Sequence, residues 1–152
     1  MGLSIIVDID GTLSNPNHRR HLVEGENKDW EKFFEKVGED GLNIWASQIC
    51  NKFYNTHKVI LVTGRPRVSK SGINVREKTL NWLQENEVAY DELYMRAEGD
   101  FRKDTVVKQE ILDNCLPDRR SITMAVDDRK DIAEMWRSNG ITCLQCKDEV
   151  EK

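Results

Sequence analysis

Residues 3–14, with the sequence LSIIVDIDGTLS, limit the fold more than any other stretch of the chain. Leu3–Val7 is a short apolar run, typical of a central parallel strand covered on both faces. Asp8 and Asp10 follow at strand spacing, so their side chains point to the same side, and Gly11 lets the backbone turn. Taken alone, the two acids could be ordinary turn residues. Open α/β sheets, however, bind ligands at the carboxyl ends of such strands.

The rest of the chain alternates strand and helix patterns, which predicts a doubly wound sheet. Further strands are expected at 59–62, 93–95, 122–126 and 141–146. Helices are expected near 29–38, 42–55, 75–86 and 104–115, and through 132–136 before Gly140. The fold class is therefore α/β, a three-layer Rossmann-like parallel sheet of about five strands. Residues 1–152 are expected to form one domain, with 15–41 as at most a small helical cap or insertion.

Some local features lead to more specific expectations. Polar residues 15–27 are expected to form a loop. The helix near 42–55 is expected to bury its large apolar side chains, which are Ile44, Trp45, Ile49, Phe53 and Tyr54. The spacing of Trp30, Phe33, Phe34 and Trp45 favours packing over the stacking of bases. Asp29 is expected to cap the helix near 29–38, and Asp104 or Thr105 the helix near 104–115.

Composition limits the partners. The 152 residues include 23 Lys and Arg against 27 Asp and Glu, so net charge predicts no broad nucleic-acid-binding face. One run, 65–76, is basic without an acid, and can be either a solvated loop or a phosphate-facing segment. No apolar run approaches the roughly 18 residues of a membrane span, and the start of the chain resembles no secretory leader, so a cytoplasmic protein is expected. The four cysteines are expected to be reduced. Zinc is improbable, because the CxxC pair at Cys143 and Cys146 has no second Cys or His pair at ligand spacing.

Three strand ends carry polar chemistry that a parallel sheet would bring to one edge. They are Asp8 with Asp10, Thr63 with Gly64 and Arg65, and Asp127 with Asp128. Four carboxylates at one edge would repel one another unless a cation lay among them, and oxygen ligands with room for a phosphate suit Mg²⁺. The phosphate could be bound by the Thr63 hydroxyl, by the backbone amides near Gly11 and Gly64, and by Lys108. Asp8 could then act as a nucleophile.

These residues, in this order, resemble the four motifs of the haloacid dehalogenase (HAD) superfamily of phosphatases. Residues 8–12 are similar to the first motif, 62–65 to the second, Lys108 to the third and Asp127-Asp128 to the fourth. The closer resemblance is to the 3′-phosphatase domain of bacteriophage-type polynucleotide kinase phosphatases, in segments 95–108, 125–129 and 134–137. The chain departs from the bifunctional enzymes because it has no GxxxxGK[ST] loop, and because 15–41 is longer.

The resemblance implies a Mg²⁺-dependent reaction. Asp8 would attack phosphorus to form an aspartyl-phosphate, and Asp10 would protonate the leaving oxygen and then take a proton from water. The metal would be held by Asp8, the backbone carbonyl of Asp10, and Asp127 with or without Asp128. These assignments predict a phosphomonoesterase acting on the 3′-phosphate of DNA or RNA.

Further residues would hold the substrate. Thr63 and Lys108 are expected to hold the transferring phosphoryl group, with Lys103 as the rival lysine. The resemblance assigns contacts with the substrate to Arg19, Arg65 and Arg96, and implies that Asp104 orients one of these arginines. Gly64, in the second motif, is also expected to bind the substrate. Arg129 could pair with a surface acid or with the substrate, and His18 and His21 are expected to be surface loop residues.

Two alternative functions remain open on the sequence. The same chemistry could act on a small nucleotide or sugar phosphate, with 15–41 covering the cleft. The chain could instead be a non-catalytic binder of phosphorylated nucleic-acid ends. No protein partner, oligomeric state or accompanying kinase or ligase can be predicted from the sequence.

Overall fold

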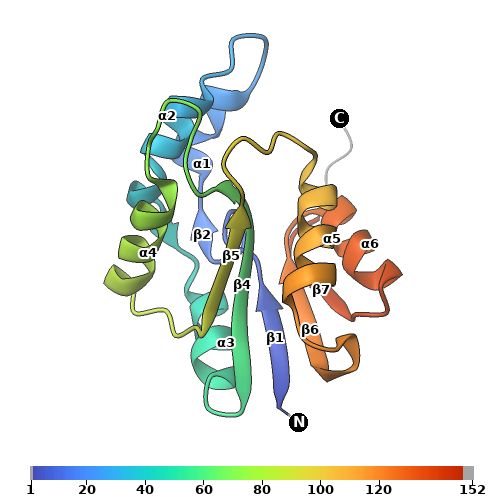
Figure 1. The fold of residues 1–152 in the computed structure, drawn as a ribbon. Helices are drawn as coiled ribbons and strands as arrows, with labels where there is room; N and C mark the ends of the chain where they lie inside the picture. Colours follow the sequence, from blue (N-terminus) through green and yellow to red (C-terminus); the bar gives the residue numbers. More distant parts are fainter. Residues whose placement is uncertain (1, 149–152) are drawn as a thin grey trace.

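The computed structural model describes residues 2–148 and is built on one parallel sheet. Its five strands lie in the order β5-β4-β1-β6-β7, with β1 at the centre. Their bounds are β1 Leu3–Val7, β4 His57–Pro66, β5 Glu92–Arg96, β6 Ile122–Asp127 and β7 Cys143–Gln145. All neighbouring pairs are parallel, so the carboxyl ends meet at the upper edge in Figure 1. The predicted fold class is confirmed.

Helices cover both faces of the sheet, which gives three layers (Figure 1). On one side α3 (Ile44–Phe53) and α4 (Val75–Glu85) pack with side chains such as Cys50 and Trp82 in the first core cluster. On the other side α5 (Asp104–Cys115) and α6 (Lys130–Ser138) contribute Val107 and Trp136 to a second cluster. Alternate residues of β1 belong to different clusters, since Ile5 lies in the first and Ile6 in the second. This two-sided burial explains the unbroken apolar run in the sequence.

Residues 15–41, called here the cap segment, lie beside the carboxyl ends of the strands (Figure 1). The expected loop at 15–27 is wrong in part, because this stretch holds short elements. The elements at and around the cap segment are β2 Ser14–Asn15, α1 Asn17–Arg20, the 3-10 helix His21–Val23, α2 Trp30–Glu35, the 3-10 helix Val37–Glu39 and β3 Gly41–Leu42. Helix α2 confirms the helix expected near 29–38, whereas the other elements are too short to show a period, and β2 and β3 form a separate antiparallel pair. Val37 is fully buried in the first core cluster, so the cap segment is joined to the main core.

Helix α3 shows where the predicted burial was wrong. Ile44 is 66% exposed, Trp45 41% and Tyr54 46%, whereas the small side chains Ala46 and Cys50 are fully buried. The apolar residues of this segment surround the helix, and only one face can contact the sheet. The expected inward positions of Ile49 and Phe53 are supported, because both pack against the first cluster.

Two helix starts test the expected caps. Asp29 caps α2, because its Oδ1 accepts a hydrogen bond from the Lys32 amide at 3.0 Å. Helix α5 begins at Asp104, but no side chain caps it. The Asp104 carboxylate is instead occupied by Arg96 and Arg129. The expected cap at Asp104 or Thr105 is therefore wrong, since the acid binds arginines.

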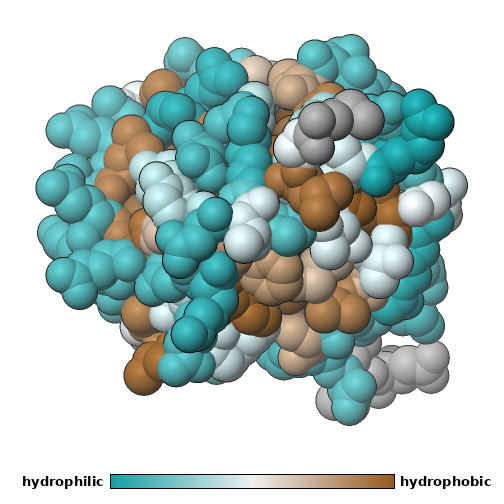
Figure 2. Space-filling model, turned by 90° about the horizontal axis from the view of Figure 1, so that it is seen from below, coloured by the Kyte–Doolittle hydropathy of each residue, from teal (hydrophilic) through white to brown (hydrophobic). Residues whose placement is uncertain are grey.

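None of the helices within residues 2–148 is long and apolar enough to cross a bilayer. Figure 2 shows the face at the amino ends of the strands, where hydrophobic side chains lie in patches between hydrophilic ones.

Candidate active site

Three buried acids from two neighbouring strand ends converge on one lysine. Asp8 follows β1, Asp127 ends β6 and Asp128 comes next, and one carboxylate oxygen from each lies within 4.8 Å of the others. Lys108, on α5, donates hydrogen bonds to Asp8 Oδ1 and Asp127 Oδ2, both at 2.9 Å. Residues about a hundred positions apart therefore form one cluster, as expected from the parallel sheet.

The charges of this cluster are unbalanced. Burial raises the pKa of Asp8 well above its ordinary value, and the negative charge of Asp127 raises it further against the opposing effect of Lys108. Burial also raises the pKa of Asp128. For Lys108, burial alone would lower the pKa, but Asp127 and Asp8 outweigh it and keep the ammonium charged. One ammonium against three carboxylates leaves net negative charge in a buried place, which a divalent cation would neutralise.

The donor set fits magnesium by its chemistry. Asp8, Asp127 and Asp128 are the only group of metal-ligand side chains this close together in residues 2–148, and all three offer oxygen. Hard oxygen ligands are those that Mg²⁺ takes in phosphate-handling sites. The carboxylate of Asp10 lies outside this group, so only its backbone carbonyl remains as the expected fourth contact.

Two close approaches build the floor of the site. Gly11 has φ +85°, and a Cβ there would lie 2.2 Å from Asp128 Oδ2. Only glycine therefore lets β1 turn beside the acid. The Thr12 hydroxyl donates to Asp8 Oδ2 at 3.3 Å.

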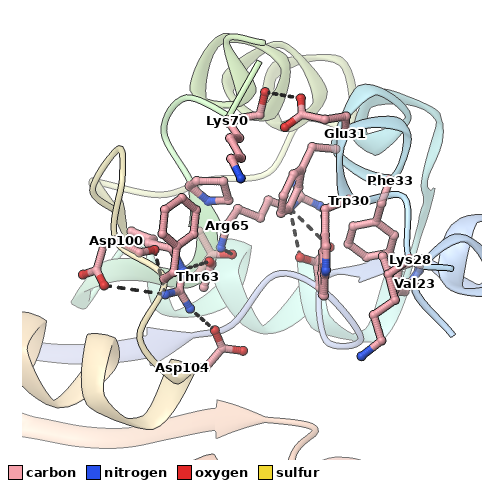
Figure 3. A pocket seen from close by; sticks show the side chains of 18 of the residues that line it. Val23, Lys28, Trp30, Glu31, Phe33, Thr63, Arg65, Lys70, Asp100 and Asp104 are labelled. Carbon is pink, nitrogen blue, oxygen red and sulfur yellow. Dashed lines mark hydrogen bonds and ion pairs between the residues drawn. The ribbon is translucent and has the colours of Figure 1, made fainter. Parts of the chain in front are cut away.

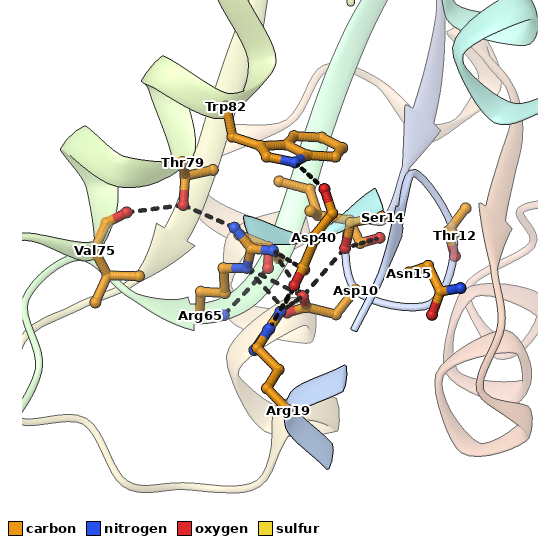
Figure 4. Close-up of polar contacts among 12 residues, drawn as sticks. Asp10, Thr12, Ser14, Asn15, Arg19, Asp40, Arg65, Val75, Thr79 and Trp82 are labelled. Carbon is orange, nitrogen blue, oxygen red and sulfur yellow. Dashed lines mark hydrogen bonds and ion pairs between the residues drawn. The ribbon is translucent and has the colours of Figure 1, made fainter. Parts of the chain in front are cut away.

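Asp10 is held by two buried arginines (Figure 4). Arg65 donates from Nε to Asp10 Oδ2 at 3.0 Å and from Nη2 to Oδ1 at 2.7 Å, and Arg19 Nη2 donates to Oδ1 at 2.5 Å. Burial alone would raise the pKa of Asp10, but the charges and hydrogen bonds of Arg65 and Arg19 hold it well below its usual range. Asp10 is therefore an ionised carboxylate in this structure, and the two arginines make it a weaker base than an ordinary aspartate.

Asp40 completes this arrangement, and the sequence did not reveal it. Its carboxylate accepts from Arg19 Nε at 2.7 Å and from Arg65 Nη2 at 3.4 Å, and the Trp82 indole donates to its backbone carbonyl at 2.7 Å (Figure 4). His18 Nε2 lies 2.7 Å from the same carboxylate. A lone acid at the end of a polar stretch has no spacing signal, so only the fold shows that Asp40 joins the two arginines. Arg19 and Arg65 are fully or almost fully buried, and they contact acids of the protein where contacts with substrate were expected.

The second motif lies between the acids and α5. Thr63 is buried, and its Oγ1 accepts from the Arg65 amide at 3.2 Å. The Gly64 carbonyl accepts from Arg96 Nε at 2.9 Å, and a Cβ on Gly64 would lie 2.6 Å from Asp104 Oδ1. Asp104 also binds Arg96 directly, the kind of contact expected of an acid that orients an arginine.

The sequence leaves open the partner of Arg129 and gives Lys103 as the rival of Lys108. Arg129 pairs with Asp104 at 2.5 Å and with Asp131 at 2.7 Å, so it contacts acids in this structure. Lys103 lies exposed at the start of α5, whereas Lys108 is buried among the acids. The geometry therefore supports Lys108 over Lys103.

Most of these groups line one large cleft of about 1420 Å³ (Figure 3), although Arg19 and Asp40 are not among its lining residues. Its walls include Asp8, Asp10, Thr63, Lys108 and Asp128 on the sheet side. The opposite walls come from the cap segment and from the loop between β5 and α5. A buried acid with an adjacent lysine at the bottom of an open cleft can present an oxygen nucleophile to a phosphate ester.

The fold and these four motifs together define a phosphatase of the HAD class. A family model for the polynucleotide kinase PNKP phosphatase domain matches residues 3–149. The chain therefore belongs to the PNKP phosphatase-domain family, and the resemblance expected from the sequence is confirmed.

Solved structures agree with this assignment. The structure of a Pnkp1/Rnl/Hen1 complex matches with a TM-score of 0.80 and 27% identity, over 99% of this chain and 48% of the matched chain. The structure of the Pnkp1/Rnl/Hen1 RNA repair complex matches with a TM-score of 0.80 and 28% sequence identity, over 97% of this chain and 43% of the matched chain. The chain thus spans about half the length, or slightly less, of these two proteins. A HAD family enzyme from Bacteroides thetaiotaomicron in complex with magnesium and inorganic phosphate shares the fold, with a TM-score of 0.57 and 10% identity over 99% of this chain and 97% of the other.

Proposed function

We propose that this chain is a Mg²⁺-dependent phosphomonoesterase that removes the 3′-phosphate from polynucleotide ends through an aspartyl-phosphate. The observation that supports this most is the position of Asp8, buried at the floor of the cleft between Lys108 and two further acids, in a chain of the PNKP phosphatase-domain family. Asp8, Asp127 and Asp128 would hold the metal. When bound, Mg²⁺ neutralises the negative charge shared by the carboxylates and the substrate phosphate.

The first chemical step uses Asp8. One of its carboxylate oxygens forms a bond to phosphorus while the bond from phosphorus to the 3′ oxygen breaks, and Asp10 gives its proton to the departing oxygen. In the ligand-free protein Arg19 and Arg65 keep Asp10 ionised. This step therefore requires the incoming phosphate to compete with Asp10 for those arginines, which accords with the expected contact of both with the substrate.

The second step releases phosphate. Ionised Asp10 takes a proton from water, the water oxygen bonds to phosphorus, and the bond to Asp8 breaks, so Asp10 recovers the proton that it gave to the leaving oxygen. Lys108 stabilises the charge on Asp8 and on the phosphoryl oxygens. The Thr63 hydroxyl, which lines the cleft, would donate to one of these oxygens.

The size of the cleft favours a polymer end over a small phosphate ester. Pockets for small molecules are usually about 300–1,000 Å³, and this cleft has about 1420 Å³. A mononucleotide would leave much of it filled with water. We retain small nucleotides as the alternative substrate class and a non-catalytic binder as the third possibility.

A substrate panel separates these functions. Phosphate release is measured with Mg²⁺ from 3′-phosphorylated DNA and RNA oligonucleotides, from the same oligonucleotides with 5′-phosphates, and from mononucleotides. We expect the 3′-phosphorylated oligonucleotides to be the best substrates, with no release by Asp8→Asn. A clear preference for mononucleotides would support the alternative, and binding of 3′-phosphorylated ends without release would identify a binder.

The matched Pnkp1 structures are complexes with Rnl and Hen1. This supports the further proposal that the phosphatase acts beside other end-repair activities, with RNA ends among its substrates. Co-purification of this chain with proteins of its own cell tests the association, and the RNA arm of the panel tests the substrate.

A further inference from the structure

Three aromatic side chains of α2 form one surface on the wall of the cleft, the cap aromatic face, made of Trp30, Phe33 and Phe34. The rings of Trp30 and Phe34 are stacked, with centroids 5.9 Å apart and planes at 27°, and Phe33 meets Trp30 edge-on at 5.5 Å. All three line the cleft that holds Asp8 (Figure 3). The chain thus has three contacting aromatic rings in the same cleft as its candidate nucleophile.

The exposure of Trp30 contradicts the expectation that it packs away from solvent, whereas Phe33 and Phe34 are half-buried and Phe34 packs against the first core cluster. Trp30 is 48% exposed, and Phe101, which lines the same cleft from the loop between β5 and α5, is 77% exposed. Leaving large aromatic surface in water forgoes the free energy of burying it. Aromatic side chains gathered on a cleft wall are informative because such patches mark binding sites.

Cations lie along the same cleft. Arg20, Lys28 and Lys70 all line it, and Figure 3 labels the side chains of Lys28 and Lys70. The Nε of Arg20 is buried and has no hydrogen-bond partner among the described residues. Buried donors of this kind are rare, so the contacts within the described residues leave the Arg20 guanidinium only partly satisfied.

Polar contacts hold the aromatic face in place. Glu31, next to Trp30, accepts hydrogen bonds from Ser69 Oγ at 2.7 Å, from the Ser71 amide at 3.2 Å and from the Ser71 hydroxyl. These contacts join α2 to the loop between β4 and α4. On the inner side, Arg19 Cζ lies 4.2 Å from the centre of the Phe33 ring. The face is therefore positioned before any ligand arrives, which lowers the entropy that binding must overcome.

We propose that the cap aromatic face is a nucleobase subsite, on which an unpaired base at or next to the scissile phosphate stacks against Trp30. This inference rests on the proposed function, because it names the occupant of the same cleft. Every nucleobase has a flat π surface, so stacking of this kind tolerates any sequence. The neighbouring cations match the phosphodiesters that join such bases. The site thus recognises a nucleic-acid end by its last bases and its charge, independently of their order.

The test compares Trp30→Ala with Trp45→Ala. Trp45 is a matched control, since it is also a half-exposed tryptophan, at 41%, but lies outside the cleft lining. Each protein is assayed on a 3′-phosphorylated oligonucleotide and on the same oligonucleotide with abasic sugars at its last two positions. Stacking on an aromatic residue supports binding strongly enough that we expect Trp30→Ala to lower kcat/KM on the normal end by about 10-fold or more. On the abasic end we expect Trp30→Ala to lower kcat/KM by less than about 2-fold. Trp30→Phe should be close to wild type, and Trp45→Ala should be unchanged on both substrates.

An equal loss on both ends, or no loss, would overturn the subsite while leaving the proposed phosphatase intact. If wild type hydrolyses neither oligonucleotide, the proposed function fails, and tryptophan fluorescence then decides the subsite separately. Titration with the normal 3′-phosphorylated oligonucleotide should quench wild type more strongly than Trp30→Ala, and the abasic one should quench both weakly. Equal quenching of the two proteins by the normal oligonucleotide would contradict the subsite.

Discussion

The floor and the cap of the cleft are built by different means. The floor is formed by strand ends, which the hydrogen bonds of β1, β4 and β6 hold in register. The cap segment consists of helices of six residues or fewer, fixed by side-chain contacts such as those of Asp40 and Glu31. The backbone ladder thus positions the chemistry, whereas individual ion pairs position the wall that meets the rest of the substrate. Substitutions in the floor should abolish the reaction, and those in the cap should change its efficiency.

The largest effect is expected for Asp8→Asn. The amide cannot act as the attacking oxygen, so phosphate release from a 3′-phosphorylated oligonucleotide should fall by at least about 10³-fold. Circular dichroism should show an unchanged fold, because Asn fills the same space and burial already disfavours the charge of Asp8. Substantial activity in this variant would remove Asp8 from the mechanism.

Lys108→Ala should be nearly as damaging, with Lys103→Ala as its matched control. Loss of Lys108 leaves three buried acids without their ammonium, so activity should fall about 10²-fold or more and the metal-free protein should lose about 3–5 kcal/mol in free energy of unfolding. Lys103 is exposed at the start of the same helix, and its removal should change both quantities little. Steady-state kinetics measure the activity, and urea unfolding measures the free energy of unfolding. A larger effect at Lys103 would exchange the roles of the two lysines.

Asp40→Asn should have an intermediate effect, since it acts through Arg19 and Arg65. We expect about a 10-fold fall in kcat/KM together with a loss of about 2–4 kcal/mol in stability, because two buried guanidinium groups lose a charged partner. Glu39→Gln is the control, as Glu39 is the exposed neighbour. A pH–rate profile separates positioning from simple destabilisation. If Asp40 positions the arginines beside Asp10, the acidic limb of the variant's pH–rate profile should shift relative to that of wild type. The profiles are measured at a temperature where both proteins are folded.

The smallest effect concerns stability in acid. The pKa of Asp10 is lower in the folded protein than its ordinary value of 3.8, so the unfolded chain binds more protons than the folded one between these two values. The stabilisation from Asp10 is therefore complete above about pH 4 and is lost as the pH falls below it. Metal-free wild type should lose stability through this window, and Asp10→Asn should lose less. The free energy of unfolding is measured in urea at several pH values. If it falls with pH equally in the two proteins, Asp10 is not held ionised.

The same contrast explains how much the sequence could predict. Residues 8–12, 62–65, Lys108 and Asp127-Asp128 were predicted because strand periodicity and the parallel sheet fix where strand ends meet, and the family resemblance gave their roles. Helix α2 and the inward positions of Ile49 and Phe53 were predicted, but the exposed side chains of α3 and the other elements of the cap segment were not, because short segments have no readable period. The exposure of Trp30 depends on which face of a helix meets the core, and helical spacing alone does not determine this.

The arginines show a further limit of the sequence. Arg19 and Arg65 were expected at the substrate, and the structure places both against Asp10 and Asp40. Ion pairs between positions far apart in the chain carry no local signal. The contact with substrate thus remains a prediction, and it requires the phosphate to replace a carboxylate that the arginines already bind.

The central claim is that Asp8 carries the phosphoryl group during turnover. The most direct measurement mixes the protein with an oligonucleotide whose 3′-phosphate is radiolabelled, in the presence of Mg²⁺, and stops the reaction in acid within the first turnover. The account predicts label on the protein that appears before free phosphate, maps to the peptide containing Asp8 and is absent from Asp8→Asn. Release of phosphate by wild type with no labelled protein at any time, or label on another residue, would contradict it.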